Sequence, residues 1–281
     1  LYYFWLYNKK KEIPGIKIFL QHGIIKDDIR FLYASNVSLD LFVCGAKREW
    51  EYISSAFGYQ DGIVKWLGLC RYDCLPVIKS EMFQTILLMP TWRSYLAERS
   101  EAGFKRSDYF KIYQSLLSNP VLHNMLRHYG FRLLFYPHYS MQRFASAFQP
   151  KSELITLCDI YTDDIQELLI RSDLLITDYS SVFFDYGYMG KPVIYYQFDQ
   201  EVFFKEHYGQ GYFQYERDGF GPVVTEEDAL LSVLKYYLQT GCKIETIYQE
   251  RANAFFGVRD QKNCKRNFAA ICTLTEKGMQ D

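Results

Sequence analysis

Short apolar runs alternate with amphipathic stretches along most of the chain. In its first part, the runs IKIFLQ (16–21), LDLFVCG (39–45) and IVKWLGL (63–69) predict buried strands, and AKREWEYISSAFG (46–58) has helical spacing and ends at a glycine. A second series begins at Thr85, with strands predicted at TILLMP, FRLLFYPH, ELITL, DLLIT and VIYY and helices between them. Strands that alternate with helices are typical of a parallel sheet covered on both faces, so the sequence predicts an α/β fold.

Residues that favour helix starts stand before several of the amphipathic stretches. Helices are expected from about Ser107, after Pro120 and from Ser140. Thr162, which is followed by two aspartates, and Thr225, which opens the sequence T-E-E-D, are expected to cap two further helices with their hydroxyls.

The change from the first series to the second predicts two domains. We place the boundary between Asp73 and Met82, which divides the chain into residues 1–78 and 79–281. The segment from Thr225 is expected to be mainly helical and to pack back across the cleft between the domains. Because the first residue is Leu and not Met, we expect the chain to be part of a longer protein and the N-terminal domain to be incomplete.

Composition narrows the class of protein. With 49% hydrophobic and 23% charged residues the chain is globular, and its net charge of -1 argues against a general nucleic-acid binder, so any phosphate must be recognised locally. The seven cysteines lack paired metal-ligand spacing and are expected to be reduced core thiols in the cytosol. The high aromatic content of 18% fits either core packing or a stacking surface.

Polar residues follow four of the predicted strands directly. Ligands of parallel α/β sheets bind at the carboxyl ends of the strands, so these residues are the candidates for chemistry. The four places are Gln21-His22-Gly23, Pro90-Thr91-Trp92-Arg93, Pro137-His138 and Thr177-Asp178-Tyr179-Ser180-Ser181.

Each candidate has a plain structural alternative. Ser180 and Ser181 fit an anion site at a helix start, but either fits an ordinary N-cap equally well. His22 and His138 are suited to proton transfer near neutral pH, although a single histidine is more often structural. Arg93 fits a bidentate phosphate clamp or a surface ion pair with a carboxylate.

Taken together, these motifs resemble the CDP-glycerol glycerophosphotransferase family of teichoic acid and capsule synthesis. The matching pieces are QHGIIKDD, LGLCRYD, LLMPTWR, FYPH, FGVRDQKNCKRN and the run LCDIYTDDIQELLIRSDLLITDYSSVFFDYGYMGKPVIYY. The long run is the most specific of them, because it joins D-Y-S-S to the flanking I-x-x-L-L-x-x-S-D and K-P-V. The resemblance implies a GT-B architecture, with two Rossmann-like domains that face a cleft.

The resemblance also implies roles for the candidate residues. It makes His22 the general base on the acceptor hydroxyl and associates His138 with the phosphates of the donor. The residues that it assigns to donor binding are Arg93, Thr177, Asp178, Ser180 and Ser181. No metal or cofactor is implied, and we expect activity without a metal.

The implied reaction transfers glycerol phosphate or ribitol phosphate from a CDP-alditol to a lipid-linked acceptor or growing polymer and releases CMP. A cytoplasmic enzyme in peripheral contact with the inner face of the membrane is expected. Two alternatives remain open: a GT-B glycosyltransferase that uses a nucleotide sugar, and a donor-binding remnant without activity. Donor choice, between a UDP-sugar and a CDP-alditol, separates the first from the main reading.

Two departures from the family pattern leave the substrates open. Many members read W-H-G-T-P-L-K where this chain reads Q-H-G-I-I-K-D-D, which resembles a capsule-associated branch and leaves the acceptor undecided. The usual D-G-K/N-x-S near the C-terminus is replaced here by residues 259–264, so donor contacts there are expected to differ.

Overall fold

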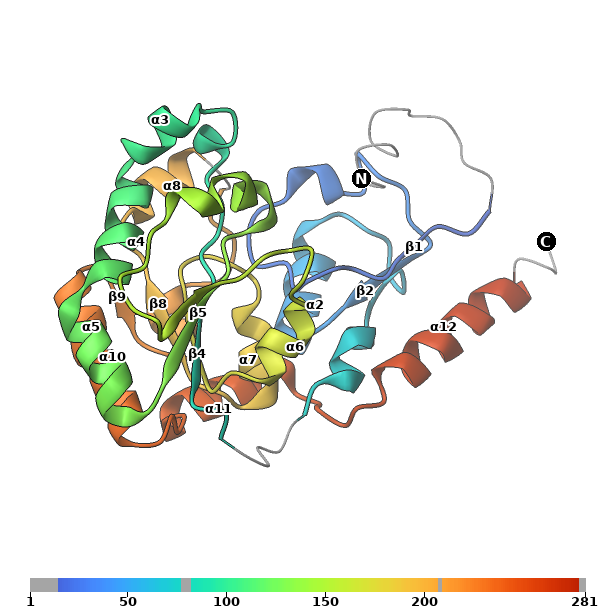
Figure 1. The fold of residues 1–281 in the computed structure, drawn as a ribbon. Helices are drawn as coiled ribbons and strands as arrows, with labels where there is room; N and C mark the ends of the chain where they lie inside the picture. Colours follow the sequence, from blue (N-terminus) through green and yellow to red (C-terminus); the bar gives the residue numbers. More distant parts are fainter. Residues whose placement is uncertain (1–14, 77–81, 207–208, 278–281) are drawn as a thin grey trace. The chain divides into compact units, whose positions relative to one another are not determined.

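Each half of the chain is built around a parallel β-sheet. The computed structural model describes residues 15–76, 82–206 and 209–277 (Figure 1). It separates into two units: unit 1 consists of residues 1–75, 209–213 and 253–281, and unit 2 of residues 76–208 and 214–252.

The chain passes from unit 1 to unit 2 between Leu75 and Pro76, within the expected range from Asp73 to Met82. The expected division at 78/79 itself lies among residues 77–81, outside the described residues. The C-terminal part of the chain differs from the expected domains. Residues 253–281, which were expected in the second domain, belong to unit 1.

Unit 1 contains a three-stranded sheet in the order β1-β2-β3. The strands are β1 (Ile18–Phe19), β2 (Leu41–Cys44) and β3 (Val64–Trp66). Helix α2 (Lys47–Ala56) packs against β2 and β3, and the 3₁₀ helices are η1 (Arg30–Leu32) and η2 (Cys70–Cys74). Phe42 and Val64 of the sheet and Ile53 and Phe57 from the region of α2 share one apolar cluster. The predicted strands and helix of the first series are therefore present.

Helix α12 (Asn263–Lys277) is held on unit 1 by side chains at its start. The Asp73 carboxylate accepts hydrogen bonds from the backbone N–H groups of Asn263 at 2.9 Å and Cys264 at 2.8 Å. Asn267 donates through Nδ2 to the carbonyl of Gly68 at 2.9 Å. These contacts explain why the C-terminal segment belongs to unit 1, because Asp73 satisfies backbone donors that a helix start leaves unpaired.

Unit 2 contains a six-stranded parallel sheet in the order β6-β5-β4-β7-β8-β9. The strands are β4 (Thr85–Leu88), β5 (Arg132–Phe135), β6 (Ile155–Leu157), β7 (Leu174–Thr177), β8 (Val193–Tyr196) and β9 (Val223–Val224). Counted from β4, this is the order 3-2-1-4-5-6 of a doubly wound Rossmann sheet, whose order reverses between the first and fourth strands. Here the reversal lies between β4 and β7, where Leu88 pairs with Ile176. A crevice for a ligand is expected at the carboxyl ends of these two strands.

Helices cover both faces of the unit 2 sheet, with α4, α5 and α10 on one face and α6 and α7 on the other (Figure 1). The helices are α3 (Glu101–Lys105), α4 (Asp108–Ser118), α5 (Pro120–Tyr129), α6 (Ile165–Ile170), α7 (Phe183–Met189), α8 (Gln200–Glu206), α9 (Tyr215–Asp218) and α10 (Glu227–Gln239). Helix α11 (Thr246–Phe256) leads from unit 2 into unit 1, and the 3₁₀ helices are η3 (Ser94–Leu96) and η4 (Tyr139–Ala147).

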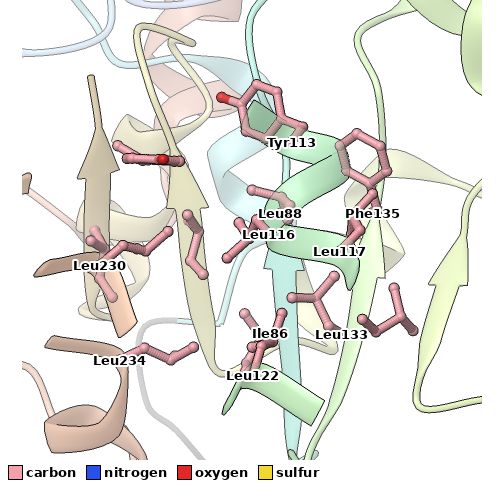
Figure 2. Packing of buried hydrophobic residues seen from close by; sticks show 14 of the residues in the cluster. Ile86, Leu88, Tyr113, Leu116, Leu117, Leu122, Leu133, Phe135, Leu230 and Leu234 are labelled. Atoms are coloured by element: carbon pink, nitrogen blue, oxygen red, sulfur yellow. The ribbon is translucent and has the colours of Figure 1, made fainter. Parts of the chain in front are cut away.

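The main core of unit 2 lies between the sheet and the helices α4, α5 and α10. Ile86 and Leu88 of β4 contribute to it together with Leu116, Leu122 and Leu230 of the helices (Figure 2). Successive side chains of a strand point to opposite faces, and both faces are covered, so all four residues of β4, β7 and β8 are buried. Burial on both faces is the reason that these strands appear in the sequence as continuous apolar runs.

Three details of the expected helices are wrong. Thr162 does not cap α6, because Asp159 and Asp163 form a turn of their own and Asp164 caps the helix by accepting from the backbone N–H of Glu167 at 2.9 Å. Thr225 lies before the N-cap of α10, Glu226, which makes no side-chain cap hydrogen bond. The helix expected from Ser140 is the 3₁₀ helix η4.

The cysteines differ in burial. Cys44, Cys158 and Cys242 are buried, but Cys74 and Cys264 are exposed, so the expectation that all the cysteines are core thiols is wrong.

Among residues 15–76, 82–206 and 209–277, no helix combines the length and apolar character of a membrane span. In the same ranges, no three His, Cys, Asp or Glu side chains are grouped to hold a metal ion.

Candidate active site

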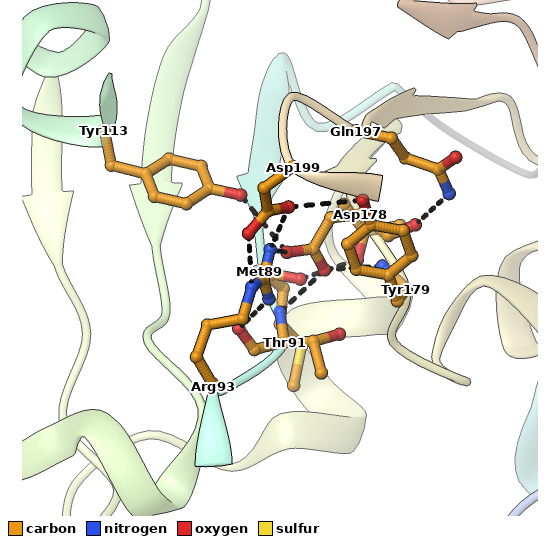
Figure 3. A network of polar contacts seen from close by, with 9 residues as sticks. Met89, Thr91, Arg93, Tyr113, Asp178, Tyr179, Gln197 and Asp199 are labelled. Carbon is orange, nitrogen blue, oxygen red and sulfur yellow. Dashed lines mark hydrogen bonds and ion pairs between the residues drawn. The ribbon is translucent and has the colours of Figure 1, made fainter. Parts of the chain in front are cut away.

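The carboxyl ends of β4 and β7 are tied together by the side chains of Thr177 and Asp178. Thr177 Oγ1 donates to the carbonyl of Met89 at 2.7 Å. Asp178 Oδ1 accepts from the backbone N–H of Thr91 at 2.7 Å (Figure 3). Both side chains are fully buried, because they lie between two central strands. Thr177 and Asp178 thus fix the two segments that flank the expected crevice.

Next to this edge of the sheet, Arg93 is a buried cation between two carboxylates. It donates to Asp199 through Nε at 2.7 Å and Nη2 at 2.9 Å, and Nη2 lies 2.9 Å from Asp178 Oδ2 (Figure 3). Nη1 donates to the carbonyl of Thr91 at 2.8 Å. Burial opposes the charge, but Asp178 and Asp199 outweigh this effect and raise the pKa of Arg93 above its ordinary value.

Aromatic rings enclose the Arg93 guanidinium. Its Cζ lies 5.0 Å from the ring centre of Phe203, 5.1 Å from Tyr179 and 5.3 Å from Tyr109. Such cation–π contacts favour a desolvated guanidinium, and the ion pairs compensate for its burial. Every nitrogen of Arg93 has a partner in the protein, so its role as a direct phosphate ligand stays a prediction. Arg93 links the segments at Thr91 and Asp178.

Ser180 and Ser181 follow this network along the chain and are half-buried. Helix α7 begins at Phe183 with Val182 at its N-cap, and no side chain caps it. The plain N-cap alternative therefore does not apply to either serine. Within the described residues neither hydroxyl has a recorded side-chain partner, so both keep a donor and acceptor capacity for a ligand.

His138 follows β5. One of its ring nitrogens, Nδ1, faces the nearby backbone, and the other, Nε2, points away from it. Its Nδ1 accepts from the backbone N–H of Ser140 at 3.2 Å, and its ring stacks on Trp92 with centroids 6.0 Å apart at 17°. Burial lowers the pKa of His138, and the charge of Asp178 partly offsets this effect. A neutral ring whose Nδ1 accepts carries its proton on Nε2, so His138 is arranged to donate a hydrogen bond.

His22 belongs to unit 1, in the loop after β1. It is exposed, whereas Gly23, Ile24 and Ile25 after it are buried. Arg71 donates through Nη1 to the backbone carbonyl of His22. Partial burial of the ring and, after it, the positive charge of Arg71 lower the pKa of His22. The residue is nevertheless exposed, so solvent reaches it. The imidazole is therefore neutral near pH 7 and able to accept a proton.

The structure brings Arg93, Thr177 and Asp178 into one hydrogen-bonded network and adds residues that the sequence reading missed. Asp199 completes the pairing of Arg93, and Gln197 Nε2 donates to the carbonyl of Asp178 at 2.9 Å. Both come just after β8, so the strand-end rule would have found them had it been applied to VIYY.

Cavities of about 420 Å³ lie at both ends of the unit 2 sheet. One is lined by Gln84 and Gly130, at the amino ends of β4 and β5. The other is lined by Asp199, Tyr109 and neighbouring residues, at the carboxyl side of the sheet. The second lies at the edge where parallel sheets bind ligands, and Asp199 is the residue that it shares with the Arg93 network.

Comparison with known proteins decides the family. Residues 69–273 match the model of the CDP-glycerol:poly(glycerophosphate) glycerophosphotransferase family. The chain belongs to this family. The matched residues include the whole network of unit 2 and His138, but not His22.

Relatives of the glycerophosphotransferase family cover most of the chain. It is 33% identical over 268 residues to the minor teichoic acid biosynthesis protein GgaB of Bacillus subtilis, which covers 92% of this chain and 29% of GgaB. It is 30% identical over 164 residues to the teichoic acid ribitol-phosphate polymerase TarL of Staphylococcus aureus, covering 58% of this chain and 26% of TarL. The chain thus spans less than a third of the length of these relatives.

The fold agrees with the family. A solved structure of the wall teichoic acid polymerase TagF has a TM-score of 0.59 and 22% identity, over 86% of this chain and 59% of that chain. The expected fold class, an α/β protein with GT-B-like Rossmann units, is confirmed.

Proposed function

We propose that this chain carries the donor site and the general base of a glycerophosphotransferase that transfers an alditol phosphate from a CDP-alditol to a polymer hydroxyl. The observation that carries the proposal is the family match over residues 69–273, which contain the strand-end network of unit 2. The acceptor oxygen attacks the β-phosphorus, which bears the alditol. A new P–O bond to the acceptor forms, the bond to CMP breaks, and the acceptor proton passes to a base.

On the donor side, we assign the pyrophosphate to the hydroxyls of Ser180 and Ser181. His138 donates through Nε2 to a phosphate oxygen, which stabilises charge on the transferring group and on the leaving CMP. Arg93, Thr177 and Asp178 contribute by fixing the segments on either side. This assignment is supported by the absence of side-chain hydrogen bonds at the two serines among the described residues and by the accepting Nδ1 of His138.

His22 is assigned as the base that takes the acceptor proton. Its lowered pKa leaves the imidazole neutral at physiological pH, and its exposed position leaves it accessible. A positioned base of this kind contributes about 10²- to 10⁴-fold to the rate. Positioning and electrostatic stabilisation supply the remainder.

CDP-glycerol is the first candidate donor, because the family description names glycerophosphate. CDP-ribitol is the second, since TarL is named a ribitol-phosphate polymerase. The acceptor that we propose is a lipid-linked, teichoic-acid-like or capsular polymer, reached in peripheral contact with the inner face of the membrane.

Calorimetric titration with CDP-glycerol, CDP-ribitol, UDP-glucose and CMP tests the donor assignment. We expect one CDP-alditol to bind and a Ser180→Ala, Ser181→Ala double variant to lose it. His22→Ala should bind the donor as the wild type does but release CMP about 10²- to 10⁴-fold more slowly. Binding of UDP-glucose alone would favour a glycosyltransferase, and binding of a CDP-alditol without turnover would favour a donor-binding remnant.

A further inference from the structure

Helix α2 carries a carboxylate with no contact to solvent. Glu49, in its first turn, is 0% exposed. A buried carboxylate is costly unless hydrogen bonds or a counter-charge compensate for it. Its partners therefore show what the residue holds in place.

The partners of Glu49 are N–H groups from two separate segments. Oε1 accepts from the backbone N–H of Ile25 at 2.6 Å and from Gln21 Nε2 at 3.2 Å. Oε2 accepts from the backbone N–H of Gly45 at 2.6 Å, and the N–H of Ala46 also donates to the carboxylate. One side chain thus joins the loop after β1 to the start of α2.

This loop is the one that carries His22. Gln21 and Ile25, which stand on either side of it, both donate to Glu49. Gln21 has a left-handed backbone (φ 62°), a conformation that costs energy for a residue other than glycine, and its Nε2 also donates to the carbonyl of Val43 at 2.6 Å. Since β1 ends at Phe19, the sheet ladder does not fix this loop. Side-chain contacts to Glu49 and from Arg71 hold it instead.

We propose that Glu49 is a positioning residue that holds the His22 loop in the geometry required for proton transfer. The inference rests on the proposed role of His22 as base. Glu49 makes no contact with the reacting atoms and acts through the backbone around His22. A carboxylate suits this task because its two oxygens accept from all four N–H groups, whereas an amide would present a donor to some of them.

The protonation of Glu49 decides the conditions of the test. Burial raises the pKa of Glu49, and the N–H donors from Ile25, Gly45, Gln21 and Ala46 oppose this effect. The net result is a pKa of about 7. Because every recorded partner is a donor, the ionised form fits the site. Assays are therefore run at about pH 8, above this pKa.

The test compares Glu49→Gln with Glu51→Gln in the complete protein. Glu51 lies on the same helix, with its side chain 53% exposed and 3.8 Å from Lys47. For Glu49→Gln we expect kcat to fall by about 10- to 100-fold, because a small misplacement of a reacting group has effects of this size. The KM and calorimetric affinity for the CDP-alditol should stay within about twofold, since the donor residues belong to unit 2, and Glu51→Gln should match the wild type.

Amide hydrogen exchange supplies the readout of the loop itself. The amides of Ile25 and Gly45 should exchange faster in Glu49→Gln, while those of β4 and β7 stay protected. If Glu49→Gln fails to fold, Gln21→Ala serves in its place, with a smaller fall in kcat and faster exchange at Ile25. Wild-type kcat and exchange in the variant, or a parallel loss of kcat and donor affinity, would overturn the inference. The role of His22 is judged separately, because a His22→Ala variant with wild-type activity refutes the base whatever Glu49 does.

Discussion

Replacing Arg93 by methionine should destabilise unit 2 severely. Methionine keeps much of the apolar volume among the aromatic rings but leaves Asp178 and Asp199 without their cation. The wild-type side chain is 0% exposed and makes contacts of 2.7–2.9 Å with both carboxylates and the Thr91 carbonyl. Removing one partner of a buried ion pair costs about 3–5 kcal/mol. At roughly 2–4 °C per kcal/mol for a unit of this size, the Tm should fall by about 6–20 °C.

The assay is urea and thermal unfolding followed by circular dichroism, with hydrogen exchange in β4 and β7 to assign the loss to unit 2. Lys105→Met is the matched control, because Lys105 pairs with Glu101 at 2.6 Å but both side chains are exposed. Its cost should be below about 0.5 kcal/mol.

A second variant separates charge from packing. Asp178→Asn keeps an oxygen to accept from the backbone N–H groups of Thr91 and Tyr179 and removes one of the two negative charges. Combined with Arg93→Met, it should recover part of the lost stability, which a double-mutant cycle measures. An Arg93→Met variant within about 1 kcal/mol of the wild type would refute the view that this ion cluster holds the site together.

Two further predictions concern the base and the packing of α7. The acid side of kcat/KM against pH should contain two ionisations, that of Glu49 near 7 and that of His22 below its ordinary 6.5. Arg71→Gln should move the His22 ionisation to higher pH by removing a positive charge, and an unmoved ionisation contradicts this. Gly187→Ala should cost about 1–3 kcal/mol of unfolding free energy, since its Cβ would lie 2.3 Å from the buried ring of Phe220. Gly103→Ala, whose nearest neighbour would be 3.4 Å away, should unfold like the wild type, and equal stability of both variants would contradict the packing argument.

The strands and the edge of the site follow from local sequence, because burial on both faces leaves an unambiguous apolar run. TILL and LLIT predict β4 and β7. The structure joins Thr177 at the end of β7, Asp178 directly after it and Arg93 in the segment that follows β4. Helix starts were harder to predict. Thr162 and Asp164 both have side chains that can cap, and only the turn formed by Asp159 and Asp163 determines which one does.

Residues defined by tertiary burial could not be found in this way. Glu49 stands in the sequence KREWE among several charged residues, and nothing local distinguishes it from Glu51. Its burial depends on the loop after β1 folding over α2, which no short-range pattern encodes. Local sequence places Asp199 near the end of β8 but does not name its partner, because its pairing with Arg93 spans 106 positions in sequence.

The division of the chain has a consequence for its synthesis and for its engineering. The polypeptide passes from one unit to the other after residues 75, 208, 213 and 252. Unit 2 is therefore complete once residue 252 is synthesised, whereas unit 1 still requires the residues that follow, including α12. A chimera that exchanges the donor unit between relatives has to keep the insert 209–213 with unit 1. A cut at a single junction would remove from unit 1 the segment whose Gly209 carbonyl accepts from the backbone N–H of Asp28.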